Sequence, residues 1–130
     1  QDDPVVPVGS GQVHFVQGDL LTSFDTQFDL VIANLPYIPT RILEELTVAQ
    51  WEPRLALDGG ESGLRAIAAL LNQATTRLNP GGTILLETEE SLGEKTLQVA
   101  RQAFPDAQHR LLDDLQGRSR VVEIQSAQAA

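Results

Sequence analysis

The sequence predicts an α/β fold: a mainly parallel sheet with helices between its strands and one antiparallel strand at the end. Three observations predict it. Residues Asp29–Ala33 are an apolar run typical of a strand buried in a parallel sheet. Residues Glu61–Leu78 repeat apolar side chains at helical spacing. Strand-like and helix-like segments also alternate along the chain, which is the order from which parallel sheets are built.

The first part of the chain predicts two strands. Residues 1–12 mix Pro and Gly without periodicity, and we interpret them as a loose lead-in. Gly9-Ser10-Gly11 leads directly into the first predicted strand, Val13–Gln17. We therefore reject a phosphate-binding glycine loop here, because that loop follows a strand and opens a helix. Gly18 and Asp19 end this strand, and the second predicted strand is Asp29–Ala33.

The middle of the chain predicts two helices and a third strand. A short helix is predicted over Arg41–Gln50. The stronger helix is Glu61–Leu78, whose apolar side chains define one buried face: Leu64, Ile67, Leu71, Ala74 and Leu78. Asn79-Pro80-Gly81-Gly82 is a helix stop and turn, which leads into a strand over Thr83–Thr88.

The last part of the chain predicts a helix and a hairpin. Ser91-Leu92-Gly93-Glu94 has the capping-box pattern that opens a helix, here predicted to run to Phe104 and stop at Pro105. Two strands, Gln108–Leu112 and Arg120–Gln125, are joined by a short polar segment suited to a hairpin turn. Residues 126–130 are a predicted tail.

Composition limits the classes of function. With 130 residues, 42% of them hydrophobic, the chain is at most one domain, spanning residues 1–130. It has no cysteine, and its two histidines lie far apart in sequence, so we predict no metal site. A net charge of −9 argues against a nucleic-acid partner. No apolar run reaches about 18 residues and no leader pattern is present, so we expect a cytoplasmic protein without a membrane span.

The candidate catalytic residues are Asn34, Leu35, Pro36 and Tyr37, directly after the apolar strand. Open α/β sheets bind their ligands at the carboxyl ends of their strands. Asn34 supplies an amide oxygen and Leu35 a backbone carbonyl, while two prolines stiffen the segment and Tyr37 adds a flat ring. Two acceptors and a ring suit the binding of a planar NH2 group. The alternative interpretation is an ordinary Pro-rich turn.

Four segments, in this order, carry a resemblance: Val13–Leu21, Asn34–Pro39, Glu52–Leu64 and Asn79–Glu87. Together they resemble the catalytic half of the HemK/PrmC family, the protein-glutamine N5-methyltransferases that modify peptide-chain release factors using S-adenosylmethionine. The resemblance runs from about Val13 to Ile124. The family usually has Asn-Pro-Pro-Tyr where this chain has Asn34-Leu35-Pro36-Tyr37, and a backbone carbonyl survives that change.

The resemblance implies roles for individual residues. Asp19 would accept the adenine amino group of S-adenosylmethionine, Leu20 would lend a backbone N–H, and Asn34 would contact both cofactor and substrate. Glu52 and Pro53 would belong to a substrate loop that folds over the active site. The alternative for Asp19 is a turn or capping aspartate. Glu87, at a strand end, could line the pocket, but the predicted catalytic set does not include it.

The resemblance also implies a class I S-adenosylmethionine-dependent methyltransferase sheet, Rossmann-like but incomplete, with strand order 3-2-1-4-5-7-6. Its first two strands, its glycine-rich loop and its ribose-binding acid are missing here. With Gln1 first and no methionine, we expect a piece of a longer protein that is inactive alone. The Asp29–Ala33 strand would then be an open edge. Three outcomes are open: the Val13–Gln17 strand moves into the vacant place, a further segment completes the sheet, or two copies pair as a homodimer, and we favour the last two.

Two other functions stay open. Adenine-N6 and ribosomal-RNA adenine methyltransferases also carry Asn-Leu-Pro-Tyr, because the adenine amino group is another planar nitrogen. Their segment corresponding to Glu52–Leu64 differs, and the acidity of this chain does not suit nucleic acid. The third possibility is an α/β fragment without independent function.

Overall fold

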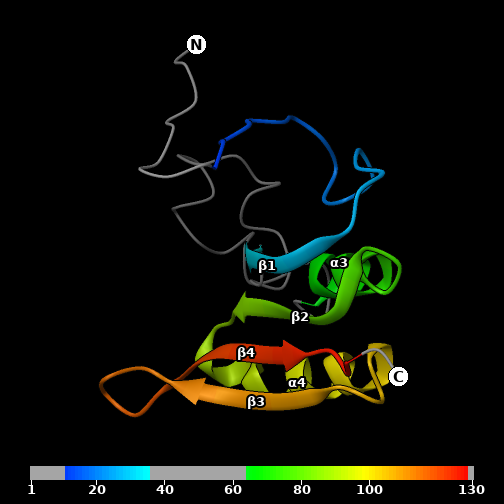
Figure 1. The fold of residues 1–130 in the computed structure, drawn as a ribbon. Helices are drawn as coiled ribbons and strands as arrows, with labels where there is room; N and C mark the ends of the chain where they lie inside the picture. The colour runs from blue at the N-terminus through cyan, green and yellow to red at the C-terminus, as the bar shows by residue number, and fades with distance from the viewer. Residues whose placement is uncertain (1–10, 36–63, 129–130) are drawn as a thin grey trace, which may run out of the picture.

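The computed structural model describes residues 11–35 and 64–128, which form a four-stranded mixed sheet with helices (Figure 1). The strands are β1 (Phe28–Asn34), β2 (Leu78–Glu87), β3 (Gln108–Asp113) and β4 (Ser119–Gln125). The helices are α3 (Arg65–Ala74), the short 3-10 helix η2 (Glu90–Leu92) and α4 (Gly93–Ala103). The predicted helix over Arg41–Gln50 lies outside the described residues.

The sheet order is β1-β2-β4-β3. β1 and β2 are parallel, whereas β4 is antiparallel to both of its neighbours, β2 and β3. The predicted mixed sheet is confirmed, as is the hairpin of the last two strands. The antiparallel strand is last in the sequence but lies inside the sheet, and this order equals the 4-5-7-6 half of the predicted class I arrangement.

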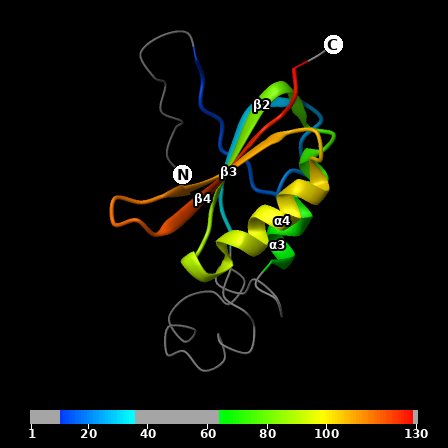
Figure 2. The same ribbon diagram turned by 90° about the horizontal axis from the view of Figure 1, so that it is seen from below.

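Both long helices pack on the same face of the sheet, where the core lies (Figure 2). Alternate residues of the two central strands point toward them, because side chains along a strand alternate between faces. Ile84 and Leu86 of β2 are almost completely buried there, as are Val122 and Ile124 of β4. The helices contribute residues at helical spacing, namely Ile67, Leu70, Leu71 and Ala74 from α3, and Leu97 and Ala100 from α4.

β1 is an edge strand, as the sequence predicted. Val31 faces the helices and is 9% exposed, but Leu30 and Ile32 point to the other face and are 52% and 70% exposed. The prediction that this strand is buried on both faces is therefore wrong. Among the described residues, nothing covers β1 on the face opposite α3 and α4.

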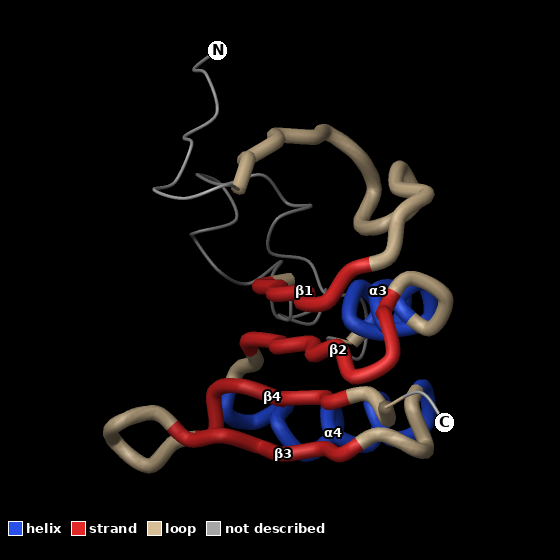
Figure 3. The backbone as a smooth tube through the Cα atoms, in the orientation of Figure 1, coloured by secondary structure: helices blue, strands red, loops and turns tan. Residues whose placement is uncertain are grey.

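The predicted strand Val13–Gln17 does not form. The described residues before β1, 11–27, contain no helix or strand, and Figure 3 draws them as a loop in tan. A strand exists only through hydrogen bonds to a neighbour, and in the predicted order this segment is not adjacent to β1. No ladder partner for it lies in the described parts of the chain, so Phe15 and Val16 are exposed.

Two predicted boundaries around β2 are wrong in detail. The predicted helix to Leu78 is too long, because α3 ends at Ala74 and Leu78 already begins β2. The Phe28 N–H donates to the carbonyl of Arg77 at 2.7 Å, which draws this segment into the sheet. The predicted turn at Asn79–Gly82 becomes an irregularity inside β2, between the pairs Phe28–Leu78 and Leu30–Thr83. Gly81 has the positive φ of +77° that the detour requires.

The predicted capping box is also wrong. The carboxylate of Glu89, two residues earlier, accepts the N–H of Ser91 at 2.9 Å and caps η2. α4 then begins at Gly93 without a side-chain cap, and its carboxyl-terminal cap at Phe104 confirms the predicted end. Among the described residues, no helix has the length and apolar character needed to cross a membrane.

Candidate functional site

The candidate site is the end of the sheet where the carboxyl ends of β1 and β2 lie side by side. Asn34 is the last residue of β1 and pairs in register with Glu87, the last residue of β2. The strands are parallel, so the two side chains lie on the same face, about 4.8 Å apart between backbones. This is the face that α3 and α4 leave open.

Both side chains are free to contact a ligand. Asn34 and Glu87 are exposed, and neither makes a hydrogen bond or ion pair with another described residue. Leu35 lies one residue beyond β1, where its side chain packs partly against the core. Pro36 and Tyr37 of the predicted catalytic segment lie outside the described residues, as do Glu52 and Pro53 of the predicted substrate loop.

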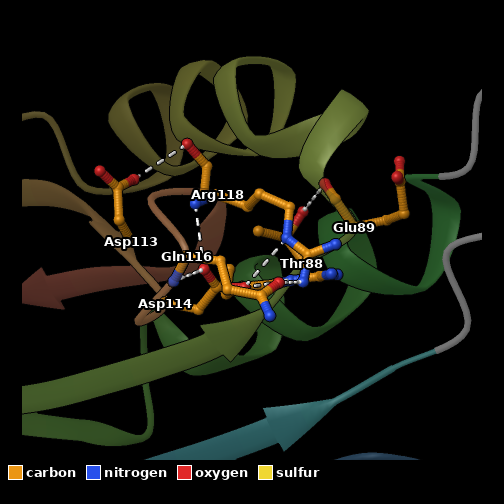
Figure 4. A network of polar contacts seen from close by, with 8 residues as sticks. Thr88, Glu89, Asp113, Asp114, Gln116 and Arg118 are labelled. Carbon is orange, nitrogen blue, oxygen red and sulfur yellow. Dashed lines mark hydrogen bonds and ion pairs between the residues drawn. The ribbon is translucent and has the colours of Figure 1, made fainter.

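Directly after Glu87, buried contacts fix the end of β2. Thr88 is 1% exposed, its N–H donates to the carbonyl of Arg120 at 2.8 Å, and its hydroxyl donates to the carbonyl of Glu89 at 3.1 Å (Figure 4). The same hydroxyl lies 3.5 Å from that of Thr96 in α4. The backbone that carries Glu87 is therefore held to both β4 and α4.

The β3–β4 hairpin turn extends from the same end of the sheet, and Asp114 holds it in place (Figure 4). The carboxylate of Asp114 accepts the N–H groups of Arg118 at 3.0 Å and Gln116 at 2.8 Å, and lies 3.2 Å from the Nε of Arg120. The hydrogen bond from the Arg118 N–H, joined by those from Gln116 and Arg120, lowers the pKa of Asp114 from 3.8 to about 2. These charges are thus committed to the turn.

The structure does not bring Asp19 and Leu20 to Asn34. Residues 19–22 form a turn closed by hydrogen bonds from Thr22 to the Asp19 carbonyl, and Leu20 has a φ of +54°. The next N–H, of Leu21, donates to Gln73 at the end of α3, beside the start of β1. Asp19 therefore lies near the amino end of β1, about 20 Å along the strand from Asn34. Its strand-end position was wrong, because the strand before it is absent.

Neither the histidines nor the hollow near Phe104 belongs to the candidate site. His109 lies in β3, with its Nε2 3.2 Å from the carbonyl of Ala100, and His14 is exposed. No group of three metal-binding side chains occurs within residues 11–35 and 64–128. An open hollow of about 270 Å³ lies between Thr75, Leu78 and Phe104, at the opposite end of the sheet from Asn34.

Comparison with known proteins gives the relationship of the chain. No family model matches it. It is 35% identical over 122 residues to the release factor glutamine methyltransferase of Rhodopirellula baltica, covering 91% of this chain and 41% of that protein. It is 39% identical over 113 residues to the release factor glutamine methyltransferase of Moorella thermoacetica, covering 85% of this chain and 40% of that protein.

The chain belongs to the HemK/PrmC family. It spans about two fifths of the length of the relatives it matches. Among solved structures, a methyltransferase from Pyrococcus furiosus superposes with a TM-score of 0.55 at 17% identity, over 80% of this chain and 43% of that one. This likeness concerns the fold alone, and it confirms an incomplete class I methyltransferase sheet.

Proposed function

We propose that this chain forms part of an S-adenosylmethionine-dependent enzyme that methylates the side-chain amide nitrogen of a glutamine in a peptide-chain release factor. The observation that carries the proposal is the place of Asn34, exposed at the carboxyl end of β1 on the open face of the sheet. The names of the curated relatives support the choice of substrate. A release-factor partner in turn favours a cytoplasmic location.

The residues of this chain would position the amide. An amide nitrogen is a poor nucleophile, because its lone pair is delocalised into the carbonyl. Acceptors that hold both N–H bonds direct the lone pair toward the methyl carbon, so that catalysis is mostly positioning together with preorganised electrostatics. The Asn34 Oδ1 atom and the Leu35 carbonyl are the proposed acceptors. Pro36 would stiffen the segment, and the ring of Tyr37 would pack against the amide.

S-adenosylmethionine, whose sulfonium is a cation, would supply the methyl group. The described residues fit its reactive end, because the uncommitted oxygens of Asn34 and Glu87 face the region where a cationic donor would meet the amide. They do not fit its adenine end, since the turn of Asp19 and Leu20 lies near the amino end of β1, whereas Asn34 lies at the carboxyl end. We keep Asp19 and Leu20 as proposed adenine contacts only for a form of the protein in which this turn approaches Asn34.

The proposal is tested on the longest protein encoded by the gene that contains this chain. It is incubated with labelled S-adenosylmethionine and, side by side, release factor, ribosomal RNA and DNA. Label in release factor, recovered as N5-methylglutamine by mass spectrometry, is the expected result. Label in nucleic acid with none in protein would replace the proposal by an adenine methyltransferase. Transfer to none of the three would favour a fragment without independent activity.

A further inference from the structure

We propose that Glu87 is a further residue of the substrate site, which binds the acceptor amide beside Asn34 and selects glutamine over glutamate. The inference rests on the proposed function and extends it to a residue outside the predicted Asn34–Tyr37 segment.

The register of the sheet places Glu87 beside the proposed acceptor. In β2 it pairs with Asn34 on one side, and its partner on the other side, in β4, is Val121. Asn34 is therefore its polar neighbour within the sheet. A separation of about 4.8 Å between strands lets two side chains contact one NH2 group, because the group carries two hydrogens that point in different directions.

Two described acids near this end of the sheet, Glu89 and Asp114, have partners, and Glu87 does not. The carboxylate of Glu89 binds Ser91, and that of Asp114 binds the hairpin turn. Glu87 has no hydrogen bond or ion pair in the described part of the chain, although the backbone beside it is fixed through buried Thr88. An exposed carboxylate without a partner, carried by a fixed backbone, is available for a ligand.

A carboxylate suits the charge change of the transfer. The nitrogen lone pair forms the new N–C bond, while the S–C bond of the methyl donor breaks and leaves its electron pair on sulfur. Positive charge therefore moves from sulfur to nitrogen. The nitrogen then loses one proton, and Glu87 can accept it and release it to water. A carboxylate near the nitrogen stabilises the charge where it arrives, so its effect is larger in the transition state than in the bound substrate.

The same charge selects the substrate. A glutamine amide presents N–H donors to the carboxylate, whereas a glutamate side chain would bring a second negative charge against it. Juxtaposed like charges disfavour the wrong partner, which makes Glu87 a specificity determinant.

The test compares Glu87→Gln with the native full-length protein. The substitution keeps size and one acceptor but removes the charge, so we expect kcat to fall about 10- to 100-fold, the range for a hydrogen bond to a charged group. S-adenosylmethionine affinity should stay unchanged. Release factor with glutamate in place of the acceptor glutamine should inhibit Glu87→Gln at least about tenfold more tightly than the native protein. Glu90→Gln, an exposed acid in η2, is the matched control and should change none of these.

The outcomes separate this inference from the proposed function. If the native protein is active and Glu87→Gln has the same kcat and the same discrimination against glutamate, Glu87 has no such role, and the proposed methyltransferase function is unaffected. No methylation of release factor by the native protein would overturn both. Glu87→Asp keeps the charge and Glu87→Ala removes it, so discrimination retained in the first and lost in the second supports the inference even if Glu87→Gln fails to fold, and equal discrimination in both overturns it.

Discussion

The open side of β1 predicts that the 130-residue chain self-associates. In the sheet of the described residues, β1 is at the edge with one row of its N–H and C=O groups unpaired, and Leu30 and Ile32 are exposed on its open face. Unpaired strand edges with apolar side chains are templates for pairing with another chain. Two copies joined through their β1 edges across a two-fold axis would pair these backbone groups and place Leu30 and Ile32 of one copy beside the same side chains of the other, which removes part of their surface from water.

The substitution Ile32→Lys measures this contact. Burying a whole isoleucine side chain contributes about 1.5–3 kcal/mol. Ile32 is 70% exposed, so pairing can contribute at most about 1–2 kcal/mol in each copy and about 2–4 kcal/mol in the dimer. At 1.4 kcal/mol per factor of ten, removing this contribution weakens association by at most about 30- to 700-fold. The two lysines would also repel one another across the axis.

Sedimentation equilibrium over a range of concentrations gives the dissociation constant. Leu115→Lys is the matched control, because Leu115 is fully exposed at the tip of the β3–β4 hairpin, away from the β1 edge. We expect Leu115→Lys to associate like the native chain and Ile32→Lys to remain monomeric. A native chain that stays monomeric at millimolar concentration, or equal weakening by both substitutions, would refute the reasoning.

Three more predictions concern the site and its support. Asn34→Ala in the full-length protein should cost about 2–4 kcal/mol of transition-state stabilisation with little loss of cofactor affinity, as measured by kcat and by calorimetric titration; near-normal turnover would remove Asn34 from the site. Thr88→Val should lower the free energy of unfolding by about 1–3 kcal/mol in urea, because the buried Thr96 hydroxyl loses its partner, and adding Thr96→Val should recover part of this loss; an unrecovered double variant would argue against the pair. Because the folded pKa of Asp114 is depressed to about 2, its contribution to stability is present above pH 3.8 and is lost as the pH falls toward 2. The stability of the hairpin is measured as the protection of its amides from hydrogen exchange between about pH 2 and 5. Asp114→Asn should remove the loss of protection at low pH, and an unchanged pH profile would contradict the prediction.

Local patterns were sufficient to predict most elements. The apolar run of β1, the helical spacing of α3 and the hairpin of β3 and β4 were all recovered, because each depends on side chains close together in sequence. The place of Asn34 at the end of β1 also followed from the sequence, since it requires only that the strand end there.

What failed depended on contacts that a linear pattern does not contain. Val13–Gln17 has strand-like residues but no ladder partner, so it forms no strand and leaves Asp19 near the opposite end of β1 from Asn34. Leu78 continues the helical spacing of α3, yet pairing with Phe28 draws it into β2. In both cases the hydrogen bonds of a distant neighbour decided the backbone.

The sequence by itself determined the family, the α/β class and the position of Asn34 at a strand end. Only the tertiary structure paired Asn34 with Glu87, because parallel register is set where β1 and β2, more than 40 residues apart, lie side by side. It also decided which face of β1 is open. The helices that follow β1 and β2 pack together on one face, so an apolar strand is buried on that side and exposed on the other.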